Sequence, residues 1–358
     1  MSRFLSNRFA ALNAYVPGEQ PDEMEYIKLN TNESPYPPPP GVIAAANECE
    51  ISKLCLYPNP DGTRLLKKLA ELYGTAPNNV IIGNGSDELL AFAFLAFCDS
   101  EHTVAFPDIT YGFYPVYAEL YGNPYTQIPL KDDFTIDPAD YLNIGKNIVI
   151  ANPNAPTGIA LPQNVIESIV QSNPNYVVLI DEAYVDFGAE SVIPLTHKYD
   201  NLLVIHTYSK SRSMAGARMS FAIGSASLIE DMNKMKYSFN PYNVNRLTQV
   251  MGEAALDEEE YFEEKRREII TTREYTKAHL RNLGFTMTDS KANFLFATHP
   301  MIGGHKLYTA LKEKGILVRH WDKLRISEYL RITIGTKTQM DALINAAADI
   351  LSRLHPIF

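Results

Sequence analysis

The sequence predicts a two-domain α/β protein, in which a large domain with a mostly parallel central sheet between helices is followed by a smaller α+β domain. Three observations favour this fold. Short apolar runs without polar alternation recur in the earlier part of the chain, helical segments separate several of them, and the pattern changes beyond about Pro241. A length of 358 residues also suits about two domains.

A proline-rich stretch at residues 35–41 marks the first boundary. Proline lacks a backbone N–H and has a fixed φ, so the stretch suits neither a helix nor a central strand. We interpret it as a stiff, extended connector that enters a domain. We therefore expect an N-terminal arm over residues 1–35, the large domain over residues 36–240 and the small domain over residues 241–358.

Four apolar runs are the strand candidates of the large domain. They lie at residues 79–82, 148–150, 176–180 and 202–206. Runs that are apolar without interruption are typical of parallel strands buried on both faces. Helical segments at residues 64–73 and 87–97 complete the α/β alternation.

The small domain begins with a charged helical segment at residues 258–283. Its apolar residues lie on one side, so its glutamates and arginines indicate a solvated face and not a chemical site. Two strand candidates follow at residues 292–297 and 330–334, and a final helix is expected at residues 339–354.

Composition excludes several classes of function. Hydrophobic residues make up 46% and charged residues 21%, as in a folded globular protein, and the net charge of −10 argues against nucleic acid as a partner. The three cysteines, Cys49, Cys55 and Cys98, lack the spacing of a disulfide framework or a zinc site. No stretch approaches the roughly 18 apolar residues of a membrane span. We expect no metal site, no membrane partner and a cytoplasmic location.

Polar residues gather where the apolar strands end, which is where open α/β sheets bind ligands. The first such place is a glycine turn at residues 83–88, between a strand and a helix. Its free N–H groups and the positive end of the helix can bind a phosphate. The turn matches neither a dinucleotide fingerprint nor a nucleotide P-loop, and a simple capped turn would explain it as well.

Two further places follow the next strands. In residues 152–158 two prolines fix a loop and orient the Asn154 amide as a donor to a ligand oxygen, although a plain turn is the simpler interpretation. Asp181 ends the most apolar strand, where a carboxylate is costly unless a cation pairs with it. A protonated ring nitrogen would be such a cation, but a helix N-cap or a salt bridge is commoner.

The fourth place is the loop at residues 207–218, where Lys210, Arg212 and Arg218 stand among several hydroxyl groups. A lysine amine among cations has a lowered pKa and becomes nucleophilic toward an aldehyde. Arg218 and the hydroxyl groups suit a phosphate. Solvation would explain any one of these residues, but the four places together indicate a shared ligand.

These places stand in an ordered series that resembles the fold type I aminotransferases, which depend on pyridoxal 5'-phosphate, and most closely their histidinol-phosphate aminotransferase branch. Further matching segments lie at residues 12–18, 28–36, 57–62 and 330–336, so the resemblance covers nearly the whole chain. The fold type I architecture is the one expected above, with the large domain as the cofactor-binding domain.

The resemblance implies a role for each matching residue. Lys210 resembles the lysine that holds the cofactor as a Schiff base, Asp181 the partner of its pyridine nitrogen, and Tyr184 a residue that, with Asn154, reaches the ring hydroxyl. Tyr111 resembles the aromatic residue that stacks on the ring. The cofactor phosphate is expected at Gly85, Ser86, Asp87, Thr207, Ser209 and Arg218.

The resemblance also implies substrate residues and a partner subunit. Arg331 resembles the arginine that binds the anionic group of the substrate, and Arg319 the second arginine that a phosphate requires. Tyr15 is the candidate to close the pocket, and Asn154 also faces the substrate in the family. Tyr57 resembles the tyrosine that a second subunit contributes to the cofactor phosphate, which implies a homodimer with shared sites.

The sequence departs from the family pattern next to the lysine. Residues 210–214 read Lys-Ser-Arg-Ser-Met instead of the usual Lys-Ala-Phe-Gly-Leu, and residues 218–221 read Arg-Met-Ser-Phe instead of Arg-Leu-Gly-Tyr. The spacing between Lys210 and Arg218 is kept. The departures therefore bear on local packing and specificity more than on cofactor binding.

The expected function is transamination between L-histidinol phosphate and 2-oxoglutarate in histidine biosynthesis. An aromatic amino-acid aminotransferase is the nearest alternative, and a threonine-phosphate decarboxylase shares nearly all of the same motifs. A ligand-sensing domain of a transcription regulator uses the same fold but would need a DNA-binding module ahead of the proline connector, where about thirty-five residues stand. The cofactor residues do not separate the three enzymes, so the substrate pocket must.

Overall fold

The computed structural model describes residues 3–10, 12–21 and 23–354, and these residues form two sheet-containing parts. In the described residues, the larger sheet has seven strands in the order β2-β8-β7-β6-β5-β3-β4. The strands are β2 (Val80–Asn84), β3 (Val104–Pro107), β4 (Tyr125–Ile128), β5 (Asn147–Ala151), β6 (Val178–Asp181), β7 (Leu202–Thr207) and β8 (Met219–Ile223). Strand β8 is antiparallel to both of its neighbours and the other pairs are parallel, which confirms the mostly parallel sheet.

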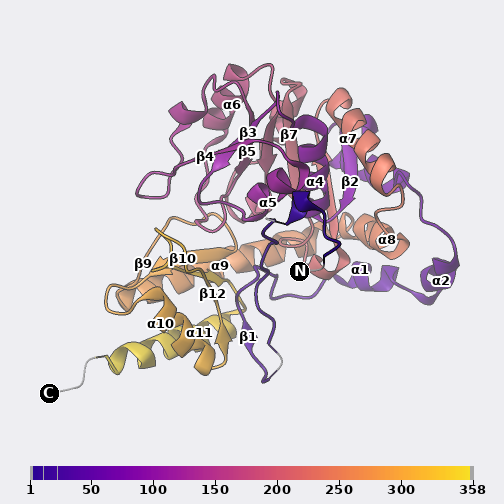
Figure 1. Cartoon of the computed structure of the whole chain (residues 1–358). Coiled ribbons are helices and arrows are strands. Elements are labelled where there is room, and N and C mark those ends of the chain that lie inside the picture. Colours follow the sequence, from indigo (N-terminus) through magenta and orange to yellow (C-terminus); the bar gives the residue numbers. More distant parts are fainter. Residues whose placement is uncertain (1–2, 11, 22, 355–358) are drawn as a thin grey trace.

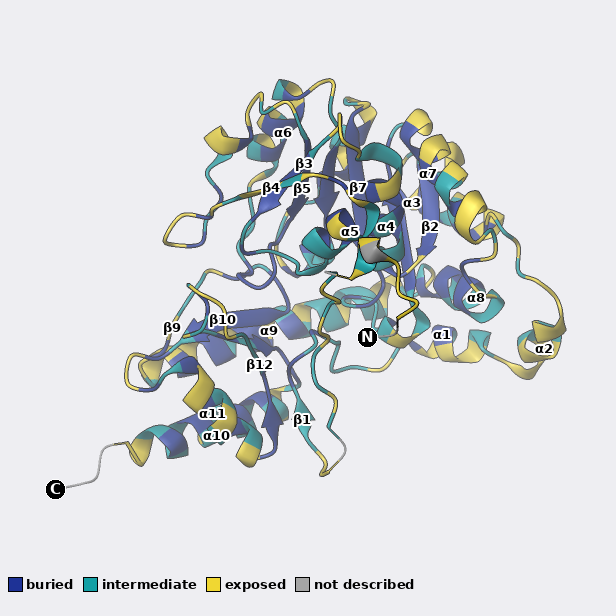
Figure 2. Cartoon of the chain, viewed as in Figure 1, coloured by how far each residue is buried: buried dark blue, intermediate teal, exposed yellow. Residues whose placement is uncertain are grey.

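Helices cover both faces of this sheet, so its strands are buried on both sides (Figure 2). One face packs against α3 (Thr63–Leu72), α6 (Gln163–Ser172) and α8 (Arg246–Ala255), and the other against α4 (Ser86–Phe97), α5 (Phe113–Tyr121) and α7 (Ala226–Phe239). In β5, Ile148 and Ile150 belong to the first core, and Val149 and Ala151 to the second. This double burial explains why the strand sequences show no polar alternation.

The smaller sheet is antiparallel, with the order β12-β13-β10-β9. Its strands are β9 (Thr286–Met287), β10 (Phe294–Thr298), β12 (Arg319–His320) and β13 (Leu330–Thr333), and its helices are α9 (Glu259–Asn282), α10 (Gly304–Glu313) and α11 (Lys337–Ser352). A separate apolar core joins these elements. In Figure 1 they form the orange and yellow part of the molecule below the seven-stranded sheet.

The N-terminal arm runs between the two parts (Figure 1). Its strand β1 (Ile27–Lys28) pairs in parallel with β11 (Ile316–Leu317), and Leu29 is buried in the smaller core. The proline connector that follows is shorter than the sequence predicts, because Pro40 already opens helix α1 (Pro40–Ala45). The fixed φ of proline suits the first position of a helix, where no N–H is needed.

The remaining helices are short. Helix α2 (Glu48–Ile51) follows α1, and the 3₁₀ helices are η1 (Asn7–Phe9), η2 (Ser52–Cys55), η3 (Pro77–Asn79), η4 (Pro138–Tyr141), η5 (Val185–Phe187), η6 (Ile193–His197) and η7 (Ala215–Ala217). No helix among the described residues has the length and apolar character that crossing a membrane requires.

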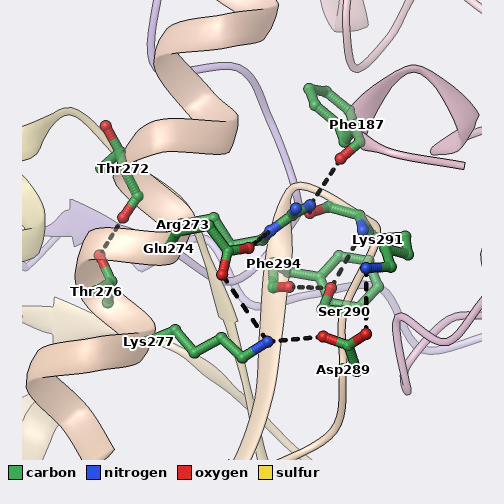
Figure 3. A network of polar contacts seen from close by, with 11 residues as sticks. Phe187, Thr272, Arg273, Glu274, Thr276, Lys277, Asp289, Ser290, Lys291 and Phe294 are labelled. Carbon is green, nitrogen blue, oxygen red and sulfur yellow. Dashed lines mark hydrogen bonds and ion pairs between the residues drawn. The ribbon is translucent and has the colours of Figure 1, made fainter.

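The long helix α9 is anchored to both parts by the buried Arg273 (Figure 3). One guanidinium nitrogen of Arg273 donates to the carbonyl oxygens of Phe187 and Ala292, each at 2.8 Å. One turn further along, Lys277 pairs with Asp289 at 2.7 Å. Phe187 belongs to the segment after β6 and Ala292 to the segment before β10, so this network fixes the junction between the two parts.

Candidate active site

A cavity of about 630 Å³ lies at the carboxyl edge of the larger sheet, between that sheet, the N-terminal arm and the smaller sheet. Strands β2, β5, β6 and β7 all point their carboxyl ends toward this edge because they are mutually parallel. The residues that follow them therefore meet in one place. Sequence-predicted residues that line the cavity are Tyr15, Ser86, Asp87, Tyr111, Asp181, Tyr184, Thr207, Ser209, Lys210, Arg218, Arg319 and Arg331.

Lys210 lines the cavity and is partly buried. Its Nζ donates to the carbonyl oxygen of Thr31 at 3.1 Å and lies 5.8 Å above the ring of Tyr184. Burial and, to a smaller extent, the nearby Arg331 lower the pKa of Lys210 to about 8, while Glu33 opposes the shift. The lowered pKa agrees with the prediction for a lysine among cations and makes the neutral, nucleophilic amine available near neutral pH.

Asp181 ends β6 with a side chain that is almost fully buried. It accepts hydrogen bonds from the Tyr114 hydroxyl at 2.9 Å and from the Ala183 amide at 3.1 Å. No lysine, arginine or histidine of the described residues forms an ion pair with it, so the salt-bridge alternative is wrong here. Burial raises the pKa of Asp181 to about 6, and a cationic ligand group facing it would relieve this cost.

The end of the cavity at the start of α4 has the properties of an anion site. The first N–H groups of α4, at Ser86 and Asp87, have no intrahelical acceptors, and the helix dipole is positive there. Gly85 has a φ of +81°, and a Cβ at this position would stand 2.2 Å from a guanidinium nitrogen of Arg218. Only glycine therefore lets Arg218 approach this turn.

Arg218 and two hydroxyl groups complete this end. Arg218 contacts Asp87 at 3.1 Å and has its side chain 43% exposed, so its remaining N–H donors are free for a ligand. Thr207 donates to the Ser209 Oγ at 2.9 Å, which leaves the Ser209 hydroxyl hydrogen available. A phosphate here would receive charge-assisted hydrogen bonds from one side and helix N–H groups from the other.

The aromatic residues and Asn154 take different positions. The Tyr111 hydroxyl donates to Asp87 at 2.7 Å, and its ring lines the cavity. The Tyr184 hydroxyl accepts from Asn32 at 3.0 Å, so its own hydrogen remains free to donate. Asn154 is buried, and its side-chain N–H groups donate to the Ile109 carbonyl and the Thr157 hydroxyl. It lies next to the cavity and is not among the residues that line it.

Two guanidinium groups face the cavity from the smaller sheet. Arg319 and Arg331 are direct partners in the antiparallel pairing of β12 and β13, so their side chains leave the same face of the sheet side by side. Trp321 lies beneath both, with ring-to-guanidinium distances of 5.4 and 5.3 Å. Like charges placed opposite each other on neighbouring strands are destabilising.

Neither arginine has a carboxylate partner among the described residues. Arg331 donates to the Asn30 carbonyl at 2.9 Å, and its buried Nε has no hydrogen-bond partner. Arg319 donates to the carbonyls of Val16 and Pro17 in the N-terminal arm. Burial lowers the pKa of Arg331, with a further contribution from Arg319. Two adjacent, unpaired cations over a cavity indicate a dianionic ligand.

Tyr15 is partly buried, whereas Tyr57 is exposed. Tyr15 stacks on Phe113 with ring centroids 4.2 Å apart and stands over the cavity beside Tyr111. Burial raises its pKa. Tyr57 is 77% exposed, stacks on Tyr242 at 4.5 Å, and is not among the residues that line the cavity.

Several residues that shape the site were given no role from the sequence, although Thr31 and Glu33 lie in the matching segment at residues 28–36. Thr31 supplies a backbone carbonyl to Lys210, Glu33 opposes the lowering of its pKa, and Tyr114 donates to Asp181. Trp321 supports both arginines. A backbone carbonyl has no residue-type signature, and the other contacts join segments far apart in the sequence, so only the folded chain identifies them.

The chain is similar to known aminotransferases over nearly its whole length. Residues 24–346 match the family model described as aminotransferase class I and II. The histidinol-phosphate aminotransferase of Brachyspira hyodysenteriae is 50% identical over 98% of this chain and 99% of its own length. The enzyme of the same name from Lactococcus lactis subsp. lactis is 48% identical over 97% of this chain and 96% of its own.

Solved structures share the fold at lower identity. The histidinol-phosphate aminotransferase of Sinorhizobium meliloti, solved in complex with pyridoxal-5'-phosphate, matches with a TM-score of 0.87 and 22% identity over 99% of this chain and 100% of that one. A mutant aspartate aminotransferase of Thermus thermophilus matches with a TM-score of 0.82 and 20% identity over 98% and 100%.

Proposed function

Because the chain belongs to the aminotransferase class I and II family, we propose that it transfers the amino group of L-histidinol phosphate to 2-oxoglutarate with pyridoxal 5'-phosphate as cofactor. The observation that carries the choice of substrate is the pair of unpaired guanidinium groups, Arg319 and Arg331, beside the Lys210 amine. The substrate phosphate is a dianion, and two arginines can bind it where one would suffice for a carboxylate. The names of the relatives support the same substrate.

The residues of the cavity fit the cofactor. Asp181 is a buried carboxylate with no cation paired to it, so it can pair with the protonated pyridine nitrogen of the cofactor. The Tyr184 hydroxyl has a free hydrogen that it can donate to the ring oxygen. The turn at Gly85 forms a cradle that a Cβ would fill, with Ser86, Ser209 and Arg218 around it. The Tyr111 ring lines the cavity and would stack on the ring of the cofactor, and Asn154 beside the cavity stays the proposed partner of the ring hydroxyl.

The bound cofactor supplies an aldehyde for covalent attachment and an electron-accepting ring. Lys210 would hold the cofactor through its neutral amine, which burial and Arg331 favour. Once free, the same Nζ could take up a proton and release it again, so one lysine would serve as both base and acid. Asp181, which accepts a hydrogen bond from Tyr114, would face the ring nitrogen and favour its protonated form.

The other residues orient the substrate. Arg319 and Arg331 bind its phosphate, and Tyr15 covers the pocket and excludes water from the reacting carbon. The bound cofactor would carry the amino group between the two half-reactions, so the first product would leave before 2-oxoglutarate binds, which predicts ping-pong kinetics. The proposed boundaries of arm, large domain and small domain are residues 1–35, 36–240 and 241–358, although α8 (Arg246–Ala255) packs on the larger sheet.

The proposed assembly is a homodimer in which Tyr57 of one subunit reaches the cofactor phosphate of the other. The exposed position of Tyr57 outside the cavity of its own chain supports this proposal. Its ring stacks on Tyr242. A cytoplasmic location is part of the same proposal, since histidine biosynthesis uses soluble substrates.

A substrate comparison tests the proposal. The value of kcat/KM for histidinol phosphate with 2-oxoglutarate should exceed those for phenylalanine and tyrosine, and threonine phosphate should release no CO₂. An equal or higher value for the aromatic amino acids would make the chain an aromatic aminotransferase. Release of CO₂ would favour the decarboxylase.

A variant connects the preference to the arginine pair. Arg319→Ala should lower kcat/KM for histidinol phosphate by about 10- to 100-fold, because a charge-assisted hydrogen bond contributes about 1.5–3 kcal/mol. The effect on phenylalanine should be several-fold smaller. Arg267→Ala, at an exposed arginine of α9 that donates only to its own helix, is the matched control and should leave both values unchanged. Equal losses for both substrates would remove Arg319 from phosphate recognition.

A further inference from the structure

Two histidines and an aspartate meet on the smaller part of the molecule, outside the cavity described above. His305 stands in the first turn of α10, His320 in the edge strand β12 and Asp322 just after it. One nitrogen of each imidazole and one carboxylate oxygen all lie within 4.8 Å of one another. These residue types are ligands of divalent transition metals.

The protonation of His320 suits a metal ligand. Its Nε2 lies 2.8 Å from the Ser327 carbonyl oxygen. A carbonyl can only accept, so Nε2 carries the hydrogen and Nδ1 of the neutral ring keeps its lone pair. Metal-binding histidines commonly donate their other N–H to a carbonyl in this way, which fixes the ring. Nδ1 has no hydrogen-bond partner among the described residues and faces Asp322 at 3.8 Å.

The three groups leave room between them. His305 Nδ1 and His320 Nδ1 lie 3.9 and 3.8 Å from the same oxygen of Asp322, which is too far for hydrogen bonds. Ligand atoms on a tetrahedral zinc ion are about 3.4 Å apart, given bonds of about 2.0–2.1 Å. The side chain of His320 is only 6% exposed, while those of His305 and Asp322 are 68% and 82% exposed. The exposed side chains of His305 and Asp322 can therefore move toward a metal ion that is bound by the fixed His320.

The carboxylates near the three groups favour a bound cation, although the N-terminus of α10 is close by. The positive end of the α10 dipole opposes a cation, but Glu328 already accepts the Gly304 N–H at 3.1 Å and Asp322 adds a second carboxylate. A Cβ on Gly304 would stand 2.3 Å from the Ser327 carbonyl oxygen. Helix α10 thus packs closely on the segment that orients His320.

We propose that His305, His320 and Asp322 form a binding site for a late first-row divalent metal ion of the Zn²⁺ class, with water in the remaining position. The ion fastens residues 320–322 to α10. Arg319 and Trp321 flank His320 in the chain, so the ion steadies the strand that presents Arg319 to the cavity. His320 and Asp322 are close in the chain, but the rest of helix α10 and strand β11 separate them from His305, so the sequence shows no metal motif. The inference does not depend on the proposed function.

Calorimetric titration of the whole protein with ZnCl₂ tests the site. The protein should carry no affinity tag, be dialysed against a chelator, and be kept in phosphate-free buffer. We expect one zinc ion per chain in this site and a higher Tm in its presence. His305→Ala and Asp322→Asn change exposed side chains, so both variants should fold. Loss of an outer-shell partner lowers metal affinity by about 10- to 100-fold. Loss of a direct ligand should lower the zinc affinity by more than this and abolish the rise in Tm.

Two controls separate this site from other zinc ligands. His102→Ala removes an exposed histidine that contacts a single aspartate, Asp99, and should bind zinc as the wild type does. Cys49→Ser combined with Cys55→Ser removes the two exposed thiols and should also leave the affinity unchanged. Wild-type affinity in both His305→Ala and Asp322→Asn, loss of binding in the cysteine variant, or no binding below millimolar zinc would each overturn the proposal.

Discussion

At the scale of single residues, the Lys210 amine is governed by opposing influences. Burial and the positive charge of Arg331 lower its pKa, and Glu33 and Asp87 raise it, with a result of about 8. The Thr31 carbonyl holds the amine in the cavity. A lysine in water has a pKa near 10.4, so the site makes the nucleophilic form far more abundant at neutral pH.

This environment predicts the pH dependence of covalent attachment. Only the neutral amine attacks an aldehyde, so the rate at which cofactor-free protein attaches pyridoxal should rise about tenfold per pH unit and level off near pH 8. Stopped-flow absorbance measures this rate. Arg331→Met should move the plateau to higher pH because it removes a cation, and Glu33→Gln should move it to lower pH because it removes an anion.

Lys210→Ala is the reference for non-specific attachment and should show no fast phase. A rate in the wild-type protein that keeps rising toward pH 10 would mean that the amine has the pKa of an ordinary lysine. A plateau that stays in place in both Arg331→Met and Glu33→Gln would mean that these charges do not act on Lys210.

The candidate site shows which residues a sequence can reveal. Lys210, Asp181 and Arg218 follow apolar strands, and the parallel sheet brings strand ends together, so their meeting follows from the pattern. The partners Tyr114, Thr31 and Trp321 come from a helix face, a backbone group and a small-sheet loop. Their contribution depends on packing distances, which periodicity does not encode.

At the scale of elements, helix α9 is fixed by its polar side as much as by its apolar one. The sequence predicts a solvated charged face on this helix, and Arg267 and Glu264 are indeed exposed. Arg273 and Lys277 are buried instead and serve the junction between the two parts (Figure 3). The charge pattern alone does not distinguish the two groups, because both alternate with glutamates along the helix.

Replacing Arg273 should destabilise the protein. In Arg273→Met the carbonyls of Phe187 and Ala292 lose a buried donor, and each unsatisfied group costs about 1–3 kcal/mol. We expect the free energy of unfolding to fall by about 2–4 kcal/mol, as measured by urea denaturation. Arg267→Met on the same helix is the matched control and should change it by less than about 0.5 kcal/mol. Equal effects of the two variants would contradict a role of the buried contacts.

The predicted strands and helices illustrate the strength and the limits of pattern. Residues 148–150 and 202–206 lie within β5 and β7, and the charged segment at residues 258–283 contains α9, as expected. Strand β8 (Met219–Ile223) was not among the predicted strands, and its antiparallel direction could not be predicted either, because an apolar run carries no sign of its direction. The start of α1 at Pro40 was missed because a proline run is typical of an extended segment, and the sequence does not show that its last proline is the first residue of a helix.

At the scale of the whole molecule, the two parts and the N-terminal arm close one cavity together. Arg319 reaches the cavity from the smaller sheet and is held by carbonyls of the arm, while Lys210 and Asp181 come from the larger sheet. The fold class follows from the sequence because double burial of a parallel sheet leaves a clear pattern. The path of the N-terminal arm could not be predicted from the sequence, because the arm pairs through its backbone groups with β11, which lies far along the chain.

The proposed shared sites make a testable claim about the assembled protein. Mixing Tyr57→Ala chains with Lys210→Ala chains should restore about a quarter of wild-type activity at limiting cofactor, because half of the dimers are mixed and each has one complete site. The two variants alone should be far less active. Activity assays after mixing, with chain exchange checked by native mass spectrometry, measure the outcome. No recovery despite exchange would place Tyr57 in the site of its own chain or outside it.

Because β12 pairs with β13, the backbone of the sheet sets the distance between the charges of Arg319 and Arg331. Arg331 stands on an inner strand, whereas Arg319 stands on the two-residue edge strand. A redesign for a singly charged substrate therefore needs to alter one edge side chain, and the sheet, the cavity wall and the lysine chemistry can stay as they are. Because Arg331 also lowers the pKa of Lys210 whereas Arg319 is not among the charges that act on it, the edge arginine is the one of the pair that can be changed without altering the lysine.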